Sequence, residues 1–586
     1  MTRFSACRSL PPFRLALLLS SIVTALPTSP VYAESGRSST FSVEEASIDQ
    51  IHSALLTRRT TCVQVVQKYL ARIEAYEPVF NAFVEVNPNA LSQAAALDAA
   101  MPRANRGKPG LTGPLHCIPI AVKDAVDSAE MPSSGGSVPL DSLAPDDATA
   151  VAKLRAAGAI IIGKTNLDEL GRGSSGLSTK GGQTLNAYDL ARIPGGSSGG
   201  SAVAVAANLA TVGIAEETGV SIRNPCANQN IACIAPTQGL VSRDGVIPIS
   251  FTQDRLGPFG KTLRDAAIVL DVIAGYDPAD PVTANSVGRR PPLGYAVWAR
   301  PGKLKGRRIG VIRELMTPYA AADEESVAIS ERALDDLEAL GATIVDSLPV
   351  DEAVGELLPT LDPAFYPSLN WAFTCDSATT IAGDCPNPGF MRMITDARTN
   401  AFEFAFAFNR YLVGRGDPVI RTLDDFIATG PFFSAGFRTN LINDGARTTL
   451  NDPEYVERQL RRRFIQELVV KLMADHQLDA IVFPMKTVPA TRVGAPGEPT
   501  VGFRAAGGNI VSSASGLPSV QVPAGFTTTV VDRIAGGGTQ VTAAALPVGL
   551  EFVGRAFSEA TLISIASSYE AATRHRRPTP LAPTLD

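Results

Sequence analysis

Residues 194–223 read PGGSSGGSAVAVAANLATVGIAEETGVSIR, and the interpretation of the chain starts from them. Residues 195–201 are all glycine or serine, a composition that forms poor helix and poor strand but permits close backbone approach and unusual dihedral angles. A flexible linker is the plain alternative. Pro194 and the apolar run Ala202–Ala210, which predicts a buried helix, favour an ordered loop at a helix start. Such a loop presents free N–H groups to an anion.

Two further segments flank this loop in the sequence. Upstream, Ile118–Asp124 (IPIAVKD) predicts a buried strand that ends near Lys123. Downstream, Glu217–Pro225 (ETGVSIRNP) contains Ser221. Because burial disfavours the charged form of a lysine, Lys123 at such a position can serve as a general base. Taken alone, however, the upstream segment favours a surface lysine paired with its neighbouring aspartate.

Together and in this order, the three segments resemble the amidase signature family. Further stretches that resemble the family are Gly163–Asn166, Ala191–Pro194, Leu256–Pro258, Gly516–Ser519 and Pro547–Gly554. The resemblance covers about residues 45–290 and 475–575 and is weak across 291–470. It implies an α/β fold with a large mixed β-sheet core, covered by helices on both faces, and a mostly helical insertion. Short apolar runs that alternate with helical stretches independently favour the α/β class.

The resemblance also implies a Ser–Ser–Lys triad in place of Ser–His–Asp. Ser221 would attack the carbonyl and become acylated, and Ser197 would bridge it to the base, Lys123. Ser197 and Ser221 are 24 residues apart, which matches the family spacing, and the family holds the bridging serine after a cis peptide bond. No metal, cofactor or histidine is expected to take part. The other implied site residues are Thr218, Gly219 and Val220 of the oxyanion hole, and Gly195, Gly196, Ser198 and Gly199 of the glycine–serine loop.

The sequence departs from the family pattern around this site. Val220 replaces the second of two glycines before the nucleophile, and valine resists positive φ. Either the loop does not need that dihedral, or the oxyanion hole is distorted. Glu217 replaces a shorter aspartate, and Cys117 replaces a glycine. Cys226 and Cys233 follow the nucleophile closely, and we hypothesise that a disulfide between them braces the active-site loop.

The first 33 residues predict a secretory signal peptide. Arg3, Arg8 and Arg14 are followed by the apolar run Leu15–Leu26 and by small residues at the expected cleavage site. A membrane anchor is the alternative, but this run is too short to span a bilayer. We therefore expect a secreted or periplasmic protein without membrane association after signal removal. The net charge of −6, made more negative by three when the signal leaves, argues against nucleic-acid binding.

The remaining cysteines are even in number, which permits disulfides in an oxidising compartment. Cys375 and Cys385 lie in a loop-like stretch rich in Pro, Gly and Asp, where a loop-closing bridge is plausible. Cys62 and Cys117 have apolar surroundings, which indicates plain core residues.

The rest of the chain, residues 34–586, is expected to form one domain: a core of about 45–290 and 475–575 interrupted by a helical insertion at about 291–470. Residues 63–79 predict a helix that Pro78 ends. Gly158–Thr165 fits the phosphate-loop pattern GxxxxGKT. Its middle residues are mostly β-branched and favour a buried strand, so we expect no nucleotide site there.

The substrate expected from the resemblance is a small amide, and esters and carbamates share its tetrahedral chemistry. The insertion is aromatic-rich, and its rings either form core or line an apolar or aromatic substrate pocket. These rings are Phe365, Tyr366, Trp371, Phe373, Phe402, Phe404, Phe406, Phe408, Tyr411, Phe432, Phe433 and Phe437. Two competing functions stay open: a subunit of a tRNA-dependent amidotransferase, and a binding protein that has lost catalysis. The sequence does not indicate an oligomeric state.

Overall fold

One mixed β-sheet runs through the molecule. The computed structural model describes residues 41–101, 103–104, 108–357, 394, 397–447, 449–495 and 508–585, and residues 41–586 cluster as one unit. The expected signal peptide and the Cys375/Cys385 pair lie outside the described residues. Among the helices that are described, none is both long and apolar enough to cross a membrane.

The sheet has 11 strands and joins segments from both ends of the chain. Two parallel groups, β5–β4–β8 and β13–β11–β12, lie on either side of an antiparallel centre, and β1 is antiparallel at one edge. This confirms the predicted large mixed sheet. In spatial order the strands are β1 (Phe83–Val86), β5 (Ile160–Thr165), β4 (Pro119–Lys123), β8 (Val212–Glu217), β10 (Arg255–Gly260), β9 (Ala232–Ala235), β14 (Ser519–Phe526), β17 (Pro547–Val553), β13 (Ala480–Pro484), β11 (Arg308–Val311) and β12 (Thr343–Val345).

Helices cover the sheet because its central strands are mostly apolar and are buried along their whole length. A row of four helices packs side by side along the sheet: α4 (Thr149–Ala156), α7 (Leu263–Ile273), α16 (Glu559–Thr573) and α8 (Glu324–Ala339). Two short helices, α5 (Gly199–Ala206) and α6 (Arg223–Asn228), pack against the central strands and against each other. These two carry the ends of the glycine–serine loop and of the Ser221 loop.

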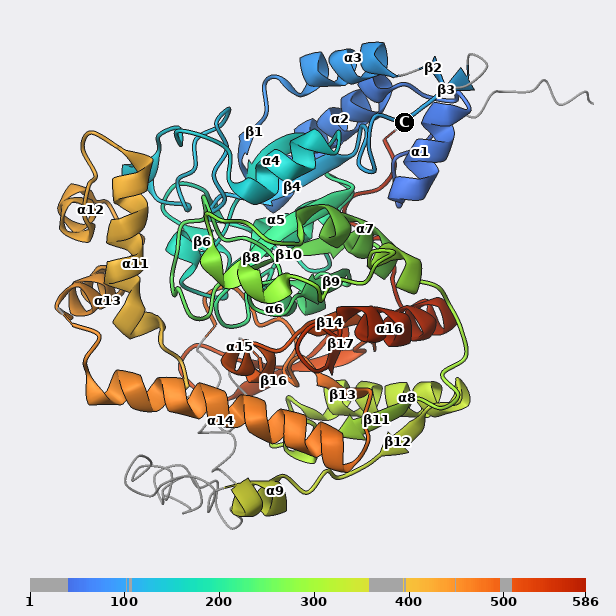
Figure 1. Cartoon of the computed structure of the whole chain (residues 1–586), viewed down its shortest axis with the longest axis vertical. Coiled ribbons are helices and arrows are strands. Elements are labelled where there is room, and N and C mark those ends of the chain that lie inside the picture. The colour runs from blue at the N-terminus through green and yellow to red at the C-terminus, as the bar shows by residue number, and fades with distance from the viewer. Residues whose placement is uncertain are drawn as a thin grey trace, which may run out of the picture. The chain divides into compact units, whose positions relative to one another are not determined.

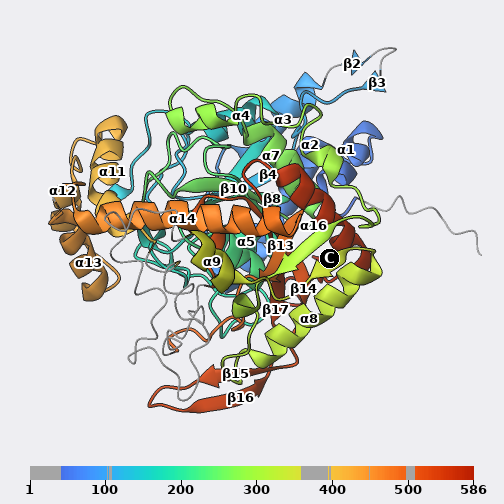
Figure 2. The same ribbon diagram turned by 60° about the horizontal axis from the view of Figure 1, so that its bottom comes forward.

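The remaining α-helices surround this core (Figure 1). They are α1 (Ile48–Leu56), α2 (Cys62–Phe80), α3 (Ala90–Ala100), α9 (Val350–Leu357), α11 (Asn400–Arg415), α12 (Leu423–Thr429), α13 (Ala435–Gly445), α14 (Pro453–Asp475) and α15 (Val511–Ser515). A two-stranded hairpin, β15 (Thr529–Arg533) with β16 (Thr539–Ala543), projects from the body in Figure 2.

The stretch 291–470 differs from the expected helical insertion. It contains β11 and β12, which join the main sheet in parallel beside β13, and α8, which packs on that part of the sheet. The mostly helical part therefore begins only after β12. The reason is that these two short parallel strands, of which β12 is the sheet edge, give a weak sequence signal next to the strong helical pattern of α8.

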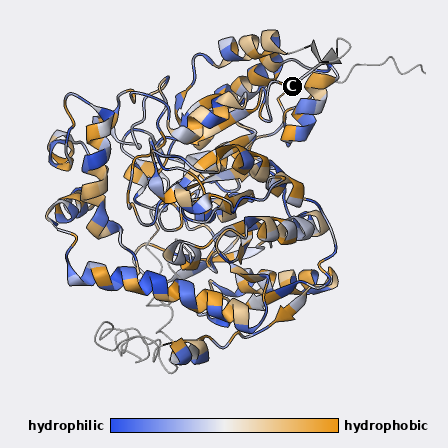
Figure 3. Ribbon diagram, viewed as in Figure 1, coloured by the Kyte–Doolittle hydropathy of each residue, from blue (hydrophilic) through white to orange (hydrophobic). Residues whose placement is uncertain are grey.

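The helical part includes α11 to α13, which pack on one another, and the long helix α14. In Figure 3 most of α14 is hydrophilic, and its apolar residues gather toward its C-terminal end. There Phe464, Leu468 and Leu472 are buried. The run AFEFAFAF, whose alternation and helical surroundings give conflicting signals, is part of α11. Its rings at Phe402, Phe404 and Phe408 are buried, as core residues are.

Helix α2 continues past Pro78, so the prediction that this proline ends the helix is wrong. A proline lacks one N–H donor, but a helix can lose a single hydrogen bond near its last turn without ending there. The helix ends at Asn81, whose left-handed φ of 53° lets its N–H bond Glu77 O at 2.8 Å. The phosphate-loop match at Gly158–Thr165 is strand β5, paired on both sides, as its β-branched residues predicted.

The cysteine predictions met two different outcomes. Cys226 and Cys233 are disulfide-bonded with Cα atoms 6.2 Å apart, in agreement with the hypothesis. Cys62 and Cys117 are also disulfide-bonded, with Cα atoms 5.4 Å apart, so the prediction of plain core residues is wrong. These two cysteines are separated by 55 residues. Only the packing of the start of α2 beside the turn before β4 brings them together, and their separation in the sequence gives no sign of it.

Candidate active site

Lys123 is the last residue of β4, a strand that lies between β5 and β8, and its side chain is fully buried. Its ammonium donates to three acceptors: Ser197 Oγ at 2.8 Å, the Glu216 carbonyl oxygen at 3.0 Å and Glu216 Oε2 at 2.7 Å. The alternative of a surface lysine paired with Asp124 does not hold. Asp124 is buried and pairs with Lys164 at 3.2 Å.

The glycine–serine loop brings Ser197 to this lysine just before α5 begins at Gly199. The Gly196–Ser197 peptide bond is cis, as the resemblance implied. Glycine is required here because the backbone is crowded: a Cβ atom on Gly196 would lie 2.0 Å from Asp168 Oδ2. Gly195 has a φ of +80°, which few side-chain-bearing residues adopt. Ser198 donates to the Glu216 carbonyl oxygen at 3.1 Å, the same oxygen that Lys123 contacts.

Ser221 lies in the loop that joins the end of β8 to the start of α6, and it is 5% exposed. Val220 is not among the residues with positive φ, so the loop does not need that dihedral at this position. Its side chain packs into an apolar cluster with Ala227 and Phe483. A Cβ atom on Gly219 would meet no atom within 4 Å, so the loop faces open space at that point.

Glu217 fixes the shape of the Ser221 loop. Its carboxylate accepts from the N–H groups of Ile222 at 3.0 Å and Arg223 at 3.2 Å, which are the first N–H groups of α6. It also accepts from the guanidinium groups of Arg223 and Arg255. Burial acts to raise the pKa of Glu217, but the two arginines outweigh it and hold the pKa below its usual range. The length of glutamate is what allows one carboxylate to reach all of these donors.

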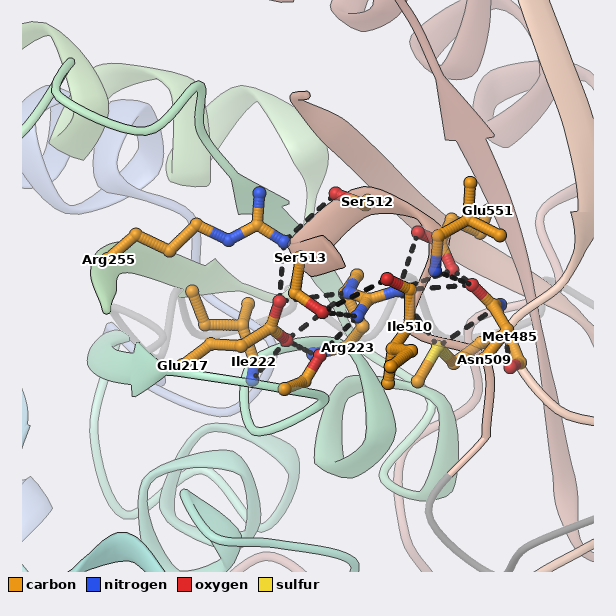
Figure 4. Close-up of polar contacts among 12 residues, drawn as sticks. Glu217, Ile222, Arg223, Arg255, Met485, Asn509, Ile510, Ser512, Ser513 and Glu551 are labelled. Carbon is orange, nitrogen blue, oxygen red and sulfur yellow. Dashed lines mark hydrogen bonds and ion pairs between the residues drawn. The ribbon is translucent and has the colours of Figure 1, made fainter. Parts of the chain in front are cut away.

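Arg223 connects this loop to the C-terminal part of the sheet (Figure 4). Its guanidinium lies between Glu217 and Glu551 of β17, at 3.0 Å from each carboxylate, and it also donates to Gly219 O. Asn509 donates to Glu551 at 3.1 Å. Paired buried charges of this kind are strongly destabilising to break, because removing one leaves the other uncompensated.

The structure brings all three expected catalytic side chains to neighbouring strand and loop ends, but it does not join them completely. Between the described hydroxyls of Ser197 and Ser221 there is no hydrogen bond. Such contacts are commonly long in a free enzyme and shorten when substrate binds. None of the loop N–H groups from Thr218 to Ser221 has an acceptor within the described chain. The disulfide of Cys226 joins α6, the helix that follows this loop, to Cys233 of β9.

Two acidic residues that meet at the Thr218 hydroxyl were not predicted from the sequence. Glu216 pairs with Lys123, and its other oxygen accepts from Thr218 Oγ1 at 3.2 Å. The same Thr218 hydroxyl lies 2.6 Å from Asp254 Oδ1. The sequence feature that accompanies Glu216 is the pair of adjacent glutamates, Glu216 and Glu217, at the end of β8. Alternation along a strand sends Glu216 and Glu217 to opposite faces, so that only one of them can engage the arginines.

A cavity of about 780 Å³ lies next to Asp254. It is bounded by Phe406 and Tyr411 of α11 and by charged residues that include Asp127, Arg243 and Arg415. The expected aromatic pocket is therefore present only in part: two of the expected rings face this cavity, whose lining is otherwise mixed. Phe365, Tyr366, Trp371 and Phe373 lie outside the described residues.

Comparisons with known proteins agree with this fold and site. The amidase family model matches residues 64–366 and 405–563. A glutamyl-tRNA(Gln) amidotransferase subunit from Microcystis aeruginosa is 33% identical over 91% of this chain and 98% of its own. A probable amidase from Arabidopsis thaliana is 30% identical over 92% of each chain. The peptide amidase structure from Stenotrophomonas maltophilia is 34% identical, with a TM-score of 0.73, and the match covers 92% of this chain and 99% of that one.

A mixed sheet that presents a buried lysine, a serine after a cis peptide and a second serine on a braced loop defines an enzyme class that cleaves carbon–nitrogen bonds. The chain belongs to the amidase signature family and is an amidase.

Proposed function

We propose that this amidase is exported and hydrolyses a small amide through an acyl-enzyme on Ser221. The observation that carries the proposal is the 2.8 Å hydrogen bond from the buried ammonium of Lys123 to Ser197 Oγ, beside the loop that holds Ser221. In the forward step Ser221 Oγ bonds to the carbonyl carbon, its proton passes to Ser197, and the proton of Ser197 passes toward Lys123. The carbonyl π electrons move to oxygen. The relay returns a proton to the nitrogen when the C–N bond breaks.

The oxyanion of this step would be stabilised by the N–H groups of Thr218, Gly219, Val220 and Ser221. Glu217 supports this assignment because it holds the loop at the first N–H groups of α6. Loss of one donor of this kind typically costs about 10²–10³ in rate. Water then attacks the acyl-enzyme by the same route, with the relay again taking and returning the proton.

Export is supported by the pattern of residues 1–33 and by the two disulfides, which form and persist in oxidising compartments. We propose a secreted or periplasmic location, and no nucleic-acid or membrane partner. For the substrate, we propose an aryl or long-chain group on one side of the amide; the cavity that Phe406 and Tyr411 border reaches Asp254, but Lys123, Ser197 and Ser221 do not line it. Esters and carbamates are expected side substrates.

The test is hydrolysis of p-nitroanilides and p-nitrophenyl esters with acetyl, butyryl and aryl-acyl groups, by wild type and by Ser221→Ala. We expect activity that is lost in the variant and specificity constants that rise with apolar acyl size. Equal constants across the acyl groups would reject the apolar preference. Inertness of folded wild type across the panel would favour a binding protein or a dependent subunit. The last role is suggested by the amidotransferase relatives and would show as activity only with partner proteins present.

A further inference from the structure

We propose that Glu216 is a positioning residue that holds a proton for Lys123, so that the base of the relay is the Lys123–Glu216 pair and not lysine alone. This inference rests on the proposed function. It concerns a carboxylate that the family resemblance did not assign.

Three oxygen atoms surround the Lys123 nitrogen. Ser197 Oγ, the Glu216 carbonyl oxygen and Glu216 Oε2 lie 2.8, 3.0 and 2.7 Å from Nζ, an arrangement in which an ammonium donates one N–H to each of them. A protonated lysine cannot take a proton from Ser197. Before it can act as a base it must give one up, and of its three acceptors only the Glu216 carboxylate is basic enough to take it.

The transfer is short and conserves charge. Glu216 Oε2 lies 2.7 Å from Lys123 Nζ, and both side chains are buried to 99% or more. As the O–H bond forms and the N–H bond breaks, an ammonium and a carboxylate become an amine and a carboxylic acid. Burial favours this neutral form because it removes two charges from a medium that solvates them poorly. The amine then takes the proton of Ser197 as Ser197 takes that of Ser221, and the pair later returns one proton to the leaving nitrogen.

Two further carboxylates lie near the Lys123–Glu216 pair. Asp254, in the loop before β10, shares the Thr218 hydroxyl with Glu216. Burial and then repulsion from Glu216 raise the pKa of Asp254 to about 7. Asp168, before the short helical turn at Glu169–Gly171, accepts from the N–H groups of Ser175 and Gly176 and is attracted to the Lys123 ammonium. Arg255 on β10 turns to Glu217 instead and leaves Glu216 without a guanidinium partner among the described residues.

The two possible bases predict opposite pH behaviour for Glu216→Gln. If the pair is the base, wild type loses activity only when the pair gains a second proton, at pH values typical of carboxylates. Glutamine leaves a lone lysine, which loses its proton at much higher pH than a carboxylate does. The acid limb of the pH–rate profile, where the rate falls as pH drops, then moves to higher pH. If lysine alone is the base, removal of the negative charge eases loss of its proton and the acid limb moves to lower pH.

The experiment measures the second-order rate of Ser221 modification by a fluorophosphonate from pH 5 to 10, a reaction that needs the base but no known substrate. For Glu216→Gln we expect about a 10²-fold loss at pH 7, partial recovery above pH 9 and an acid limb shifted upward. A downward shift, or no shift, would overturn the proposal. Glu331→Gln on α8, at a partly exposed ion pair with Arg313, is the matched control and should behave as wild type.

Glu216→Asp keeps the proposal testable if the glutamine variant does not fold. It retains the buried charge but draws the carboxylate back by one methylene, so we expect roughly a 10²-fold slower reaction with the fold intact by circular dichroism. Wild-type rates in Glu216→Asp would contradict the proposal. If wild type itself is not modified at Ser221, the proposed function fails. If wild type reacts and the limb moves downward in Glu216→Gln, this inference alone fails.

Discussion

Lys123 Nζ lies 2.7 Å from Glu216 Oε2 and 2.8 Å from Ser197 Oγ, so one buried ammonium links a carboxylate to the bridging serine. The strand order creates this contact, because β4 and β8 are parallel neighbours and both end at the same edge of the sheet. The consequence is that the charge of Lys123 is compensated in the fold. Lys123 therefore has two roles: it contacts the bridging serine of the proposed relay, and it pairs with a buried carboxylate of the fold.

Replacement of Lys123 separates these two roles. We expect Lys123→Met to lower kcat/KM by at least about 10²-fold and to lower the free energy of unfolding by about 3–5 kcal/mol, because Glu216 is left as an unpaired buried charge. The double variant Lys123→Met/Glu216→Gln should regain most of the stability and none of the activity. Urea unfolding and hydrolysis assays measure the two quantities. A double variant as unstable as the single one would contradict the pairing.

The acid stability of the protein depends in part on Glu217. Its pKa is lowered in the fold, so its stabilisation is complete above the unfolded value near 4.5 and is lost as pH falls through the folded value. We expect Glu217→Gln to be less stable by about 3 kcal/mol at pH 7 and to have a flatter stability profile below pH 4.5.

Glu559 is the matched control for this titration. It is also buried, but burial raises its pKa, so stability falls as pH rises from about 4.5 toward the folded value. Glu559→Gln should remove that decline instead. Urea unfolding at a series of pH values compares the two variants, and equal profiles for both would count against the assignment of Glu217.

Val220 is expected to be a packing residue and not a defect in the oxyanion loop. Its backbone avoids positive φ and its side chain is buried among apolar neighbours. Val220→Gly should therefore leave kcat within about tenfold of wild type while lowering the free energy of unfolding by about 2–3 kcal/mol. A large gain in kcat on this change would show that valine distorts the oxyanion hole.

The two disulfides differ in the length of chain that they close. Cys62–Cys117 closes a 55-residue separation and Cys226–Cys233 one of 7 residues. On the chain-entropy model we expect Cys62→Ala/Cys117→Ala to cost about 4 kcal/mol and Cys226→Ala/Cys233→Ala about 2 kcal/mol. Alkylation of the unfolded, non-reduced protein followed by mass spectrometry should leave all four cysteines unmodified. Modified cysteines at these positions would disprove the pairings.

Much of the fold follows from local sequence. The apolar runs of β4, β5, β13, β14 and β17 predict strands because their residues suit a sheet that is buried on both faces. The same argument correctly rejects a phosphate loop at β5. Pairings between distant segments leave no such local sign. For this reason β11, β12 and the Cys62–Cys117 bond cannot be predicted from local patterns. The end of α2 was misplaced for a different reason: Pro78 removes only one hydrogen bond near the last turn, and the helix continues past it.

In the site, too, some residues can be predicted from local motifs and others depend on which strands are neighbours. Lys123, Ser197 and Ser221 can be predicted because their surrounding motifs are specific in residue type and order. Glu216 cannot, because an acidic residue at a strand end carries no specific pattern. Its importance comes from the neighbour that the sheet supplies, and only the placement of β4 beside β8 shows which of the two adjacent glutamates meets the lysine.

In the proposed mechanism Ser221 forms the acyl-enzyme. The most direct test of this step is rapid mixing of wild type with a p-nitrophenyl ester, acid quench within the first turnover and peptide mass spectrometry. We predict the mass of the acyl group on the peptide that contains Ser221, and its absence in Ser221→Ala. Acylation of another residue, or turnover with no acylated peptide at any quench time, would contradict the account.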